Sequence, residues 1–157
     1  MKKLFLSTLL LLLTLSAFSQ ETYQVNTYYA DLGGYVISVI DNGTHGTVVA
    51  MQDQEAGTSG YDAQTVVSNP DNHDIAGKAV KGWRVPRIDE LTLMYNIFKD
   101  GNYPQFNVGS NQMEDSYSYW SSTVNEQGSF IVWDFVRNTK SLPPLTGRYN
   151  VRAVRDF

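Results

Sequence analysis

The stretch GGYVISVIDNGTHGTVVAMQD, residues Gly33–Asp53, predicts a β-hairpin around which the rest of the fold is arranged. Residues Tyr35–Ile40 and Thr47–Met51 are rich in the β-branched and aromatic residues that favour strands. Between them, Asp41–Gly43 is typical of a turn because Asn and Gly tolerate positive φ. We expect a hairpin tip of about six residues, ending at Gly46. Alternation along the first strand places Tyr35, Ile37 and Val39 on one face, and Val36 and Ile40 on the other.

Downstream of the hairpin, the clearest helix is predicted over residues 87–98, directly after Pro86. Asp89 and Glu90 fall in its first turn, where carboxylates favour the positive end of the helix dipole. Gly101 follows the last apolar position and is expected to end the helix. The apolar face of this helix consists of Ile88, Leu91, Met94, Tyr95 and Phe98.

Three β segments are predicted after the helix, over Tyr119–Thr123, Phe130–Arg137 and Tyr149–Val154. The second is apolar on both faces, which is typical of a strand inside a covered sheet. In it we expect Phe130, Val132 and Val136 on the face opposite Ile131, Trp133 and Phe135.

The last strand is expected to lie against the opening hairpin, with Val151 and Val36 in one sheet. The helix should then pack over that sheet through Leu91 and Tyr95. Residues 61–67 fit either a short helix or a strand, and residues 75–80 fit one helical turn or two. The sequence therefore predicts an α+β fold with a small twisted, mostly antiparallel sheet, one clear helix and long loops.

Four ordered blocks of the sequence resemble one bacterial family. They are the hairpin stretch quoted above, GWRVPRIDELTLMY (82–95), YWSST (119–123) with FIVWDF (130–135), and YNVRAVRDF (149–157). The set is similar to the Lcl C-terminal domain family, a C-type-lectin-like group of secreted bacterial proteins, and to Fibrobacter-type major paralogous domains. The resemblance implies a C-type-lectin-like fold, in which the two ends of the chain meet in a small sheet crossed by a helix. Arg87 departs from the Ser or Thr common in the family at that position.

The first nineteen residues have the three-part layout of a secretory signal peptide. Lys2 and Lys3 precede the apolar run Leu4–Leu15, which is shorter than the ~20 residues that a membrane-spanning helix needs. Cleavage after Ser19 would leave Gln20 as the first residue of one C-type-lectin-like domain, residues 20–157. We therefore expect an exported protein, in the periplasm, on the outer surface or secreted, without membrane insertion after cleavage.

Composition excludes several classes of protein. The chain has no Cys, so it has no disulfide framework, zinc ribbon or cysteine nucleophile. Residues 20–77 contain eight acidic and no basic residues, and the formal net charge of the whole chain is −4. Phosphate binding needs a clustered positive surface, so we expect no nucleic acid partner.

Aromatic residues could form a sugar-binding platform, but core packing is the favoured interpretation for Trp83, Trp120 and Trp133. The pair Trp133-Asp134 resembles part of the calcium-binding strand of sugar-binding C-type lectins, which has Trp-Asn-Asp. The Asn is absent here, and a full set of six to eight oxygen ligands cannot be assembled. We therefore expect neither a metal nor another cofactor.

Polar residues near His73 are a second candidate site. Asp71, His73 and Asp74, with Asp53 and Glu55 upstream, could bind a metal or supply acid–base chemistry, although a solvated loop explains such a cluster better. In the last strand, Arg152 and Arg155 could bind an anion, but pairing with carboxylates such as Asp89 or Glu90 is the favoured interpretation.

These observations lead to a non-catalytic binding or adhesion module at the cell surface, with a glycan or protein ligand. We expect its site on the loops, since a rigid scaffold with variable loops is a common way to build recognition. The alternatives are a structural subunit of a surface assembly and, third, a hydrolase using His73 and Asp74. The longest loops are 101–118, 125–129 and 138–148, and the contact candidates are Asn125, Glu126, Trp133, Asp134, Lys140 and Arg148.

Overall fold

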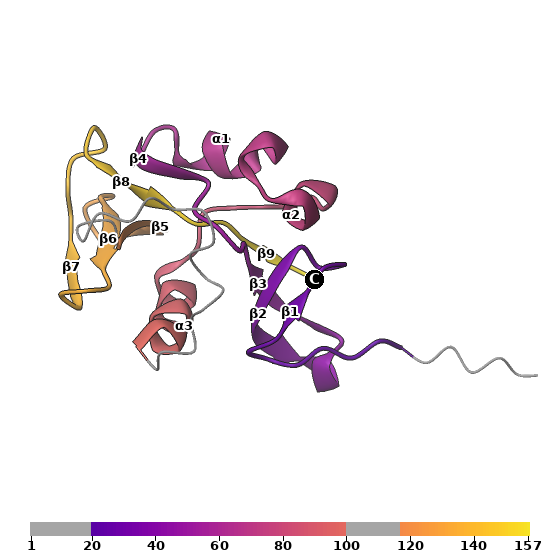
Figure 1. The fold of residues 1–157 in the computed structure, drawn as a ribbon. Helices are drawn as coiled ribbons and strands as arrows, with labels where there is room; N and C mark the ends of the chain where they lie inside the picture. The colour runs from indigo at the N-terminus through magenta and orange to yellow at the C-terminus, as the bar shows by residue number, and fades with distance from the viewer. Residues whose placement is uncertain (1–19, 100–116) are drawn as a thin grey trace, which may run out of the picture.

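The computed structural model describes residues 20–99 and 117–157, which form an α+β arrangement of two sheets and a few short helices (Figure 1). The strand pairings are antiparallel except for one, between β5 (Ser118–Val124) and β8 (Arg148–Val151). The predicted α+β class is therefore confirmed, but with two sheets instead of one. The predicted signal peptide and residues 101–116 of the predicted loop 101–118 lie outside the described residues.

The first sheet contains the predicted hairpin and has the strand order β1-β2-β3-β9. The connection is shorter than expected, because His45 already pairs with Ile40. Asn42 and Gly43, within the short 3₁₀ turn η1 (Asp41–Gly43), have φ of 56° and 88°, a region that Asn and Gly adopt at low cost. The strands are β1 (Tyr28–Tyr29), β2 (Gly34–Ile40), β3 (His45–Val49) and β9 (Val154–Asp156).

A β-bulge in β2 changes the face that Val39 occupies. The pairing with β3 passes from Val36 directly to Ser38, so Ile37 is an extra residue. An extra residue reverses the alternation of side chains beyond it. Val39 therefore packs with the cluster that contains Val36, and its predicted place beside Tyr35 and Ile37 is wrong.

The second sheet has the strand order β4-β8-β5-β6-β7 and includes the predicted strands near Tyr119 and Phe130. Two of its strands, β4 and β7, were not predicted, and residues 138–148 were expected to form a loop. The remaining strands of this sheet are β4 (Glu55–Ser59), β6 (Phe130–Asp134) and β7 (Thr139–Ser141).

The strand β6 ends earlier than predicted because a turn begins at Asp134. Its carboxylate accepts a hydrogen bond of 2.8 Å from the backbone N–H of Arg137. Asn138 completes the turn with a φ of 52°. Val136 lies in this turn and is 58% exposed, so its expected place on the buried face with Val132 is wrong.

The closing segment, predicted as one strand, is divided between the two sheets. Val151 ends β8 in the second sheet, whereas Val154 begins β9 and pairs with Val49 of the first. The expectation that Val151 and Val36 share a sheet is therefore wrong. The expectation that the closing strand lies against the hairpin is confirmed through β9 alone.

Two crossover segments, residues 50–54 and 152–153, carry the chain between the sheets and are hydrogen-bonded to each other. The backbone N–H of Ala50 donates to the carbonyl oxygen of Ala153 at 2.9 Å. The backbone N–H of Gln54 donates to the carbonyl oxygen of Val151, the last residue of β8, at 3.0 Å. The side chain of Gln54 in turn accepts a hydrogen bond from the N–H of Ala153. The two sheets therefore meet along a paired backbone.

Short helices occupy both regions that the sequence left open, and the predicted helix is present. Figure 1 shows α1 and α2 on one side of the β8–β9 path and α3 on the other. In the described residues, no helix is long and apolar enough to span a membrane. The helices are α1 (Ala63–Ser68), the 3₁₀ turn η2 (Pro70–Asn72), α2 (Ile75–Ala79) and α3 (Ile88–Lys99).

Within residues 20–99 and 117–157, buried side chains form two clusters. Val36, Val48, Trp120 and Val151 belong to one, which therefore draws on both sheets. The second packs α3 onto the strands, and contains Tyr35, Val49, Leu91, Met94 and Trp133. Leu91 is fully buried and the ring of Tyr95 lies 5.0 Å from that of Trp133, which confirms these two predicted contacts of the helix. The side chain of Phe98, also predicted on this face, lies outside the described part of the structure.

Candidate functional site

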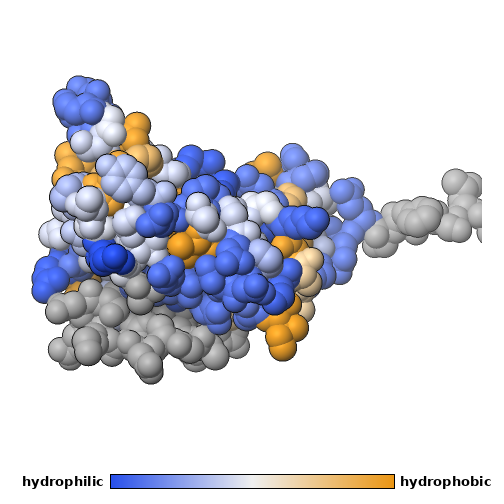
Figure 2. All heavy atoms as spheres, turned by 90° about the horizontal axis from the view of Figure 1, so that it is seen from above, coloured by the Kyte–Doolittle hydropathy of each residue, from blue (hydrophilic) through white to orange (hydrophobic). Residues whose placement is uncertain are grey.

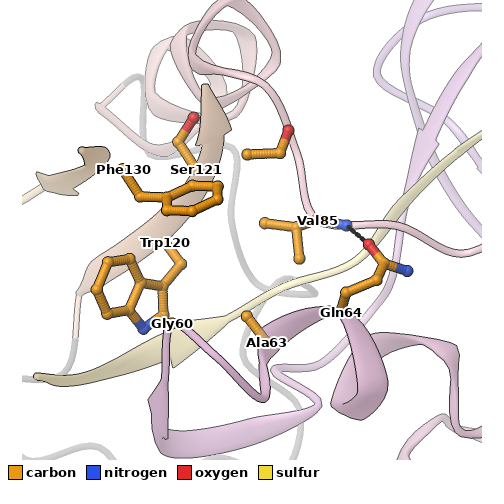
Figure 3. A pocket seen from close by; sticks show the side chains of 8 residues that line it. Gly60, Ala63, Gln64, Val85, Trp120, Ser121 and Phe130 are labelled. Carbon is orange, nitrogen blue, oxygen red and sulfur yellow. Dashed lines mark hydrogen bonds between the residues drawn. The ribbon is translucent and has the colours of Figure 1, made fainter. Parts of the chain in front are cut away.

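A small hollow opens between α1, β5 and Val85, with a volume of about 100 Å³ (Figure 3). The rings of Trp120 and Phe130 and the side chains of Val85 and Ala63 converge on it. It is therefore mostly apolar. The residues that line it are Gly60, Ala63, Gln64, Val85, Trp120, Ser121, Ser122 and Phe130.

Trp120 forms one fixed wall of the hollow. Its side chain projects from β5 and is 1% exposed. The indole Nε1–H donates a hydrogen bond of 2.8 Å to the backbone carbonyl of Thr58 in β4. The ring of Tyr149 meets the indole edge-on at 5.2 Å. These contacts hold the wall in place before any ligand arrives.

Gly60 forms a second wall, at a place where a larger residue would be crowded. A Cβ atom at this position would lie 2.7 Å from Leu145 Cδ2 and 3.1 Å from the indole of Trp120. The backbone N–H of Gly60 also donates to the carbonyl oxygen of Leu145 at 2.8 Å. The chain entering α1 is therefore fixed close to the indole.

Gln64 joins α1 to the neighbouring segment. Its side-chain oxygen accepts a hydrogen bond from the backbone N–H of Val85, which Figure 3 shows as a dashed line. Its amide nitrogen donates to Ser68 Oγ at 2.8 Å and to the carbonyl oxygen of Trp83 at 3.3 Å. Both ends of this side chain therefore make hydrogen bonds inside the protein.

The two serines of β5 that line the hollow, Ser121 and Ser122, also bond within the fold. Ser122 Oγ donates to the carbonyl oxygen of Pro86 at 3.2 Å, and its backbone N–H donates to the same oxygen at 2.8 Å. Ser121 is 1% exposed, and its Oγ accepts from the backbone N–H of Thr123 at 2.9 Å. Figure 3 shows the Ser121 oxygen turned away from the indole of Trp120.

Of the residues predicted from sequence as contacts, the structure brings Trp133, Asp134 and Lys140 together on β6 and β7. The Lys140 ammonium lies 4.3 Å from the centre of the Trp133 ring, in a cation–π contact. Asp134 pairs with the Arg137 guanidinium at 2.8 Å. Partial burial raises the pKa of Asp134, but the N–H groups and guanidinium of Arg137 outweigh it and hold that pKa below its usual value.

The other three predicted contacts lie elsewhere. Asn125 and Glu126 are in the turn at the opposite end of β6, where Asn125 Oδ1 accepts hydrogen bonds from the N–H groups of Gln127 and Ser129. Arg148, on β8, donates to the carbonyl oxygen of Gly57 in β4 at 2.9 Å. The six predicted residues therefore do not form one site, and none of them lines the hollow.

The predicted core positions of the tryptophans are confirmed. Trp83, Trp120 and Trp133 are 6%, 1% and 4% exposed, so these rings present no flat surface to solvent for a sugar to stack on. Trp120 is instead a buried wall of the hollow.

The expected solvated loop around His73 is only partly solvated, because Asp71 is exposed whereas His73 is buried. The ring stacks on Trp83 with centres 4.9 Å apart, and Nε2 lies 2.8 Å from the carbonyl oxygen of Val67. Asp74 Oδ1 accepts a hydrogen bond from the N–H of Gly77 and caps α2. Both side chains proposed for hydrolysis therefore hold local structure.

The arginines of the closing segment have carboxylate and carbonyl partners, but not the predicted ones. Arg152 is fully buried and its Nε lies 2.6 Å from Asp53 Oδ1. Burial raises the pKa of Asp53, and the Arg152 guanidinium opposes that rise. Arg155 donates instead to the carbonyl oxygens of Lys81 and Leu32, both at 3.0 Å.

Glu90, the predicted partner of these arginines, binds two others. Its carboxylate accepts hydrogen bonds of 2.7 Å and 2.6 Å from Arg84, which also contacts Asp156 at 2.9 Å. Arg87 lies 3.0 Å from the same carboxylate. Across residues 20–99 and 117–157, no three His, Asp or Glu side chains gather closely enough to hold a metal ion.

Sequence reasoning identified Trp120 as buried but missed the hollow next to it. Gly60, Gln64, Ser122 and Phe130 come from segments far apart in the chain, so no spacing signal joins them. The apolar pattern of β5 and β6 indicated their burial, but the space left between packed side chains depends on tertiary contacts.

No protein-family model matches this chain, and no curated protein matches it significantly.

Proposed function

We propose that this chain is an exported, non-catalytic binding module of the cell surface, and that the hollow beside Trp120 receives part of a glycan or protein ligand. We further propose that its fold is C-type-lectin-like. The pairing of β9 with the opening hairpin and the packing of α3 over the strands support this assignment, since the sequence resemblance implies both. The layout of residues 1–19 supports export.

The observation that carries the proposal is an apolar concavity with fixed walls. The positions of Trp120 and Gly60 are set by hydrogen bonds and close packing, so a ligand would not have to order them. Preorganised walls lower the entropic cost of binding.

Binding is favoured over acid–base catalysis because, in the part of the chain that the structure describes, the buried carboxylates and the buried histidine already make structural contacts. Asp53 pairs with Arg152, and Glu90 with Arg84. His73 stacks on Trp83 and contacts a carbonyl oxygen. A general acid or base must instead reach the substrate.

The test applies residues 20–157 to arrays of glycans and extracellular-matrix proteins, with and without calcium. Ser122→Phe places a ring at the exposed rim of the hollow and should remove binding of every ligand that enters it. Val124→Phe is the matched control, because Val124 is on the same strand, 47% exposed and not part of the lining.

Hits that survive Ser122→Phe unchanged would show that the hollow is not the binding site. An array without hits would favour a second candidate, a structural subunit of a surface assembly. The observation in favour of that candidate is an apolar edge at the hairpin tip, where Val25 and Ile40 are 45% and 63% exposed and line one shallow hollow. On the face in Figure 2, apolar side chains otherwise occupy small separate areas.

A further inference from the structure

We infer that a second hollow, next to Lys81, binds an oxyanion, the carboxylate, sulfate or phosphate group of a ligand. This Lys81 hollow is lined by Ser68 at the end of α1, by Pro70 of η2 and by residues 78–83. It shares no lining residue with the hollow beside Trp120. The inference therefore stands independently of the proposed function.

The Lys81 hollow is large enough for a small molecule. Its volume is about 430 Å³, and sites for small molecules typically have ~300–1,000 Å³. A Cβ atom added at Gly82 would meet no atom within 4 Å, so the backbone of the lining is open at this point. An oxyanion can therefore enter together with part of the molecule that carries it.

Three consecutive backbone donors of the lining have no acceptor. In the part of the chain that the structure describes, the N–H groups of Lys81, Gly82 and Trp83 make no hydrogen bond within the protein. Trp83 is only 6% exposed, and a buried backbone N–H without a partner is rare. Successive free N–H groups are a common component of anion-binding sites. These donors are therefore available to a ligand that accepts hydrogen bonds.

Other contacts hold the same segment in place before any ligand arrives. The carbonyl oxygen of Lys81 accepts a hydrogen bond of 3.0 Å from Arg155 Nε. The carbonyl oxygen of Trp83 accepts one of 3.3 Å from the Gln64 amide, and its indole N–H donates to Gly77 at 2.9 Å. The carbonyl groups and the indole are therefore used in the fold, while the N–H groups are not. Such an ordered segment lowers the entropic cost of binding.

The charged residues of the lining are both lysines, Lys78 and Lys81. Within residues 20–99 and 117–157, the Lys81 ammonium has no carboxylate at ion-pair distance. The Arg155 guanidinium, bonded to the Lys81 carbonyl oxygen, brings a third positive charge to the same segment. Cations combined with free N–H groups favour an oxyanion over a neutral hydroxyl, because charge-assisted hydrogen bonds are stronger.

The acidic residues that flank these groups in the chain are Asp31, Asp71, Asp74 and Asp156. Asp31 accepts from the Tyr23 hydroxyl, Asp74 accepts from the N–H of Gly77, and Asp156 pairs with Arg84. Asp71 pairs with Lys78, and its side chain is 75% exposed. Exposed pairs of this kind are weak. A bound oxyanion therefore competes with Asp71 for Lys78, whereas Lys81 is available to it.

The test titrates residues 20–157 with sodium phosphate, sodium sulfate and sodium acetate, with sodium chloride at equal ionic strength as the reference. Binding is followed by NMR shifts of the backbone N–H groups of residues 81–83. We expect saturable shifts from at least one oxyanion, with a Kd of about 10 mM or lower, and none from chloride. Tighter binding of phosphate or sulfate would assign a tetrahedral group to the ligand, and tighter binding of acetate would assign a carboxylate.

Two substitutions should change the affinity in opposite directions. Lys81→Gln should weaken binding about threefold to fivefold, as expected for an exposed ion pair. Asp71→Asn should tighten it, because Lys78 loses its competing carboxylate. Lys99→Gln is the matched control, since it removes the same charge from the exposed end of α3, on the other side of the β8–β9 path (Figure 1).

The inference would be overturned if no oxyanion gave saturable shifts, or if chloride gave the same ones. It would also be overturned if Lys81→Gln behaved like Lys99→Gln, or if Asp71→Asn weakened binding. None of these results bears on the hollow beside Trp120, which Ser122→Phe tests separately.

Discussion

At the scale of single residues, the burial of His73 should make the free energy of unfolding depend on pH. Its Nδ1 atom is buried and has no hydrogen-bond partner, whereas Nε2 contacts the carbonyl oxygen of Val67. The neutral ring satisfies this arrangement by donating from Nε2. Burial lowers the pKa of His73, and the Val67 carbonyl and the Asp74 carboxylate only partly oppose that effect.

We therefore predict that the free energy of unfolding falls as the pH drops below about 6.5, the ordinary pKa of histidine. In that range the unfolded chain binds a proton at His73 and the folded chain does not, so acid favours unfolding down to the lowered folded pKa. The slope contributed by this residue is at most about 1.4 kcal/mol per pH unit. Urea unfolding between pH 5 and pH 7.5 measures it.

The matched comparison is His73→Gln against His45→Gln. Glutamine at position 73 retains an N–H donor for Val67 but does not titrate, so the slope should flatten. The side chain of His45 is 55% exposed at the hairpin tip, so His45→Gln controls for the replacement of a histidine that is not buried. Equal slopes in the wild type and His73→Gln would contradict the prediction.

At the scale of elements, the start of α3 depends on a residue from a distant strand. The carboxylate of Glu90 accepts from the N–H of Arg87, as the acidic residue of a capping box does. Arg87 has no hydroxyl to supply the other half. Thr123 of β5 compensates, since its Oγ1 accepts from the N–H of Ile88 at 3.0 Å.

We predict that Thr123→Val lowers the free energy of unfolding by about 1 kcal/mol, the usual cost of a lost helix cap. Valine has nearly the same shape, so the change removes the acceptor and little packing. Thr146→Val is the control, because Thr146 is exposed and lies outside the helix contacts. Urea unfolding of both variants measures the change in the free energy of unfolding. Equal changes for Thr123→Val and Thr146→Val would show that the cap contributes nothing.

The elements that the sequence predicted correctly are those with local signals. The turn at Asn42-Gly43 and the apolar spacing of α3 each reside in one continuous stretch, and both are present. The bulge at Ile37 and the division of the closing strand were missed, because each depends on pairing with a strand far away. The hollow was missed for the same reason, since its walls meet only in three dimensions.

At the scale of the whole molecule, the pair Arg152–Asp53 joins the two places where the chain changes sheet. Asp53 lies in the crossover from β3 to β4, and Arg152 in the crossover from β8 to β9. The side chain of Arg152 is 0% exposed and that of Asp53 is 6% exposed, and the Tyr119 hydroxyl also contacts the carboxylate at 3.4 Å. Because both crossovers and both sheets meet here, we expect the sheets to unfold together.

We predict that Arg152→Met lowers the free energy of unfolding by about 3–5 kcal/mol, because it leaves the Asp53 carboxylate buried without its cation. Arg137→Met, which breaks an exposed pair with Asp134, should cost less than about 1 kcal/mol. Adding Asp53→Asn to Arg152→Met should recover part of the loss, since the uncompensated charge is then removed. Far-UV circular dichroism and tryptophan fluorescence should report one common transition in each variant. Separate transitions, or a cost for Arg152→Met no larger than that for Arg137→Met, would mean that the sheets are stabilised independently of this pair.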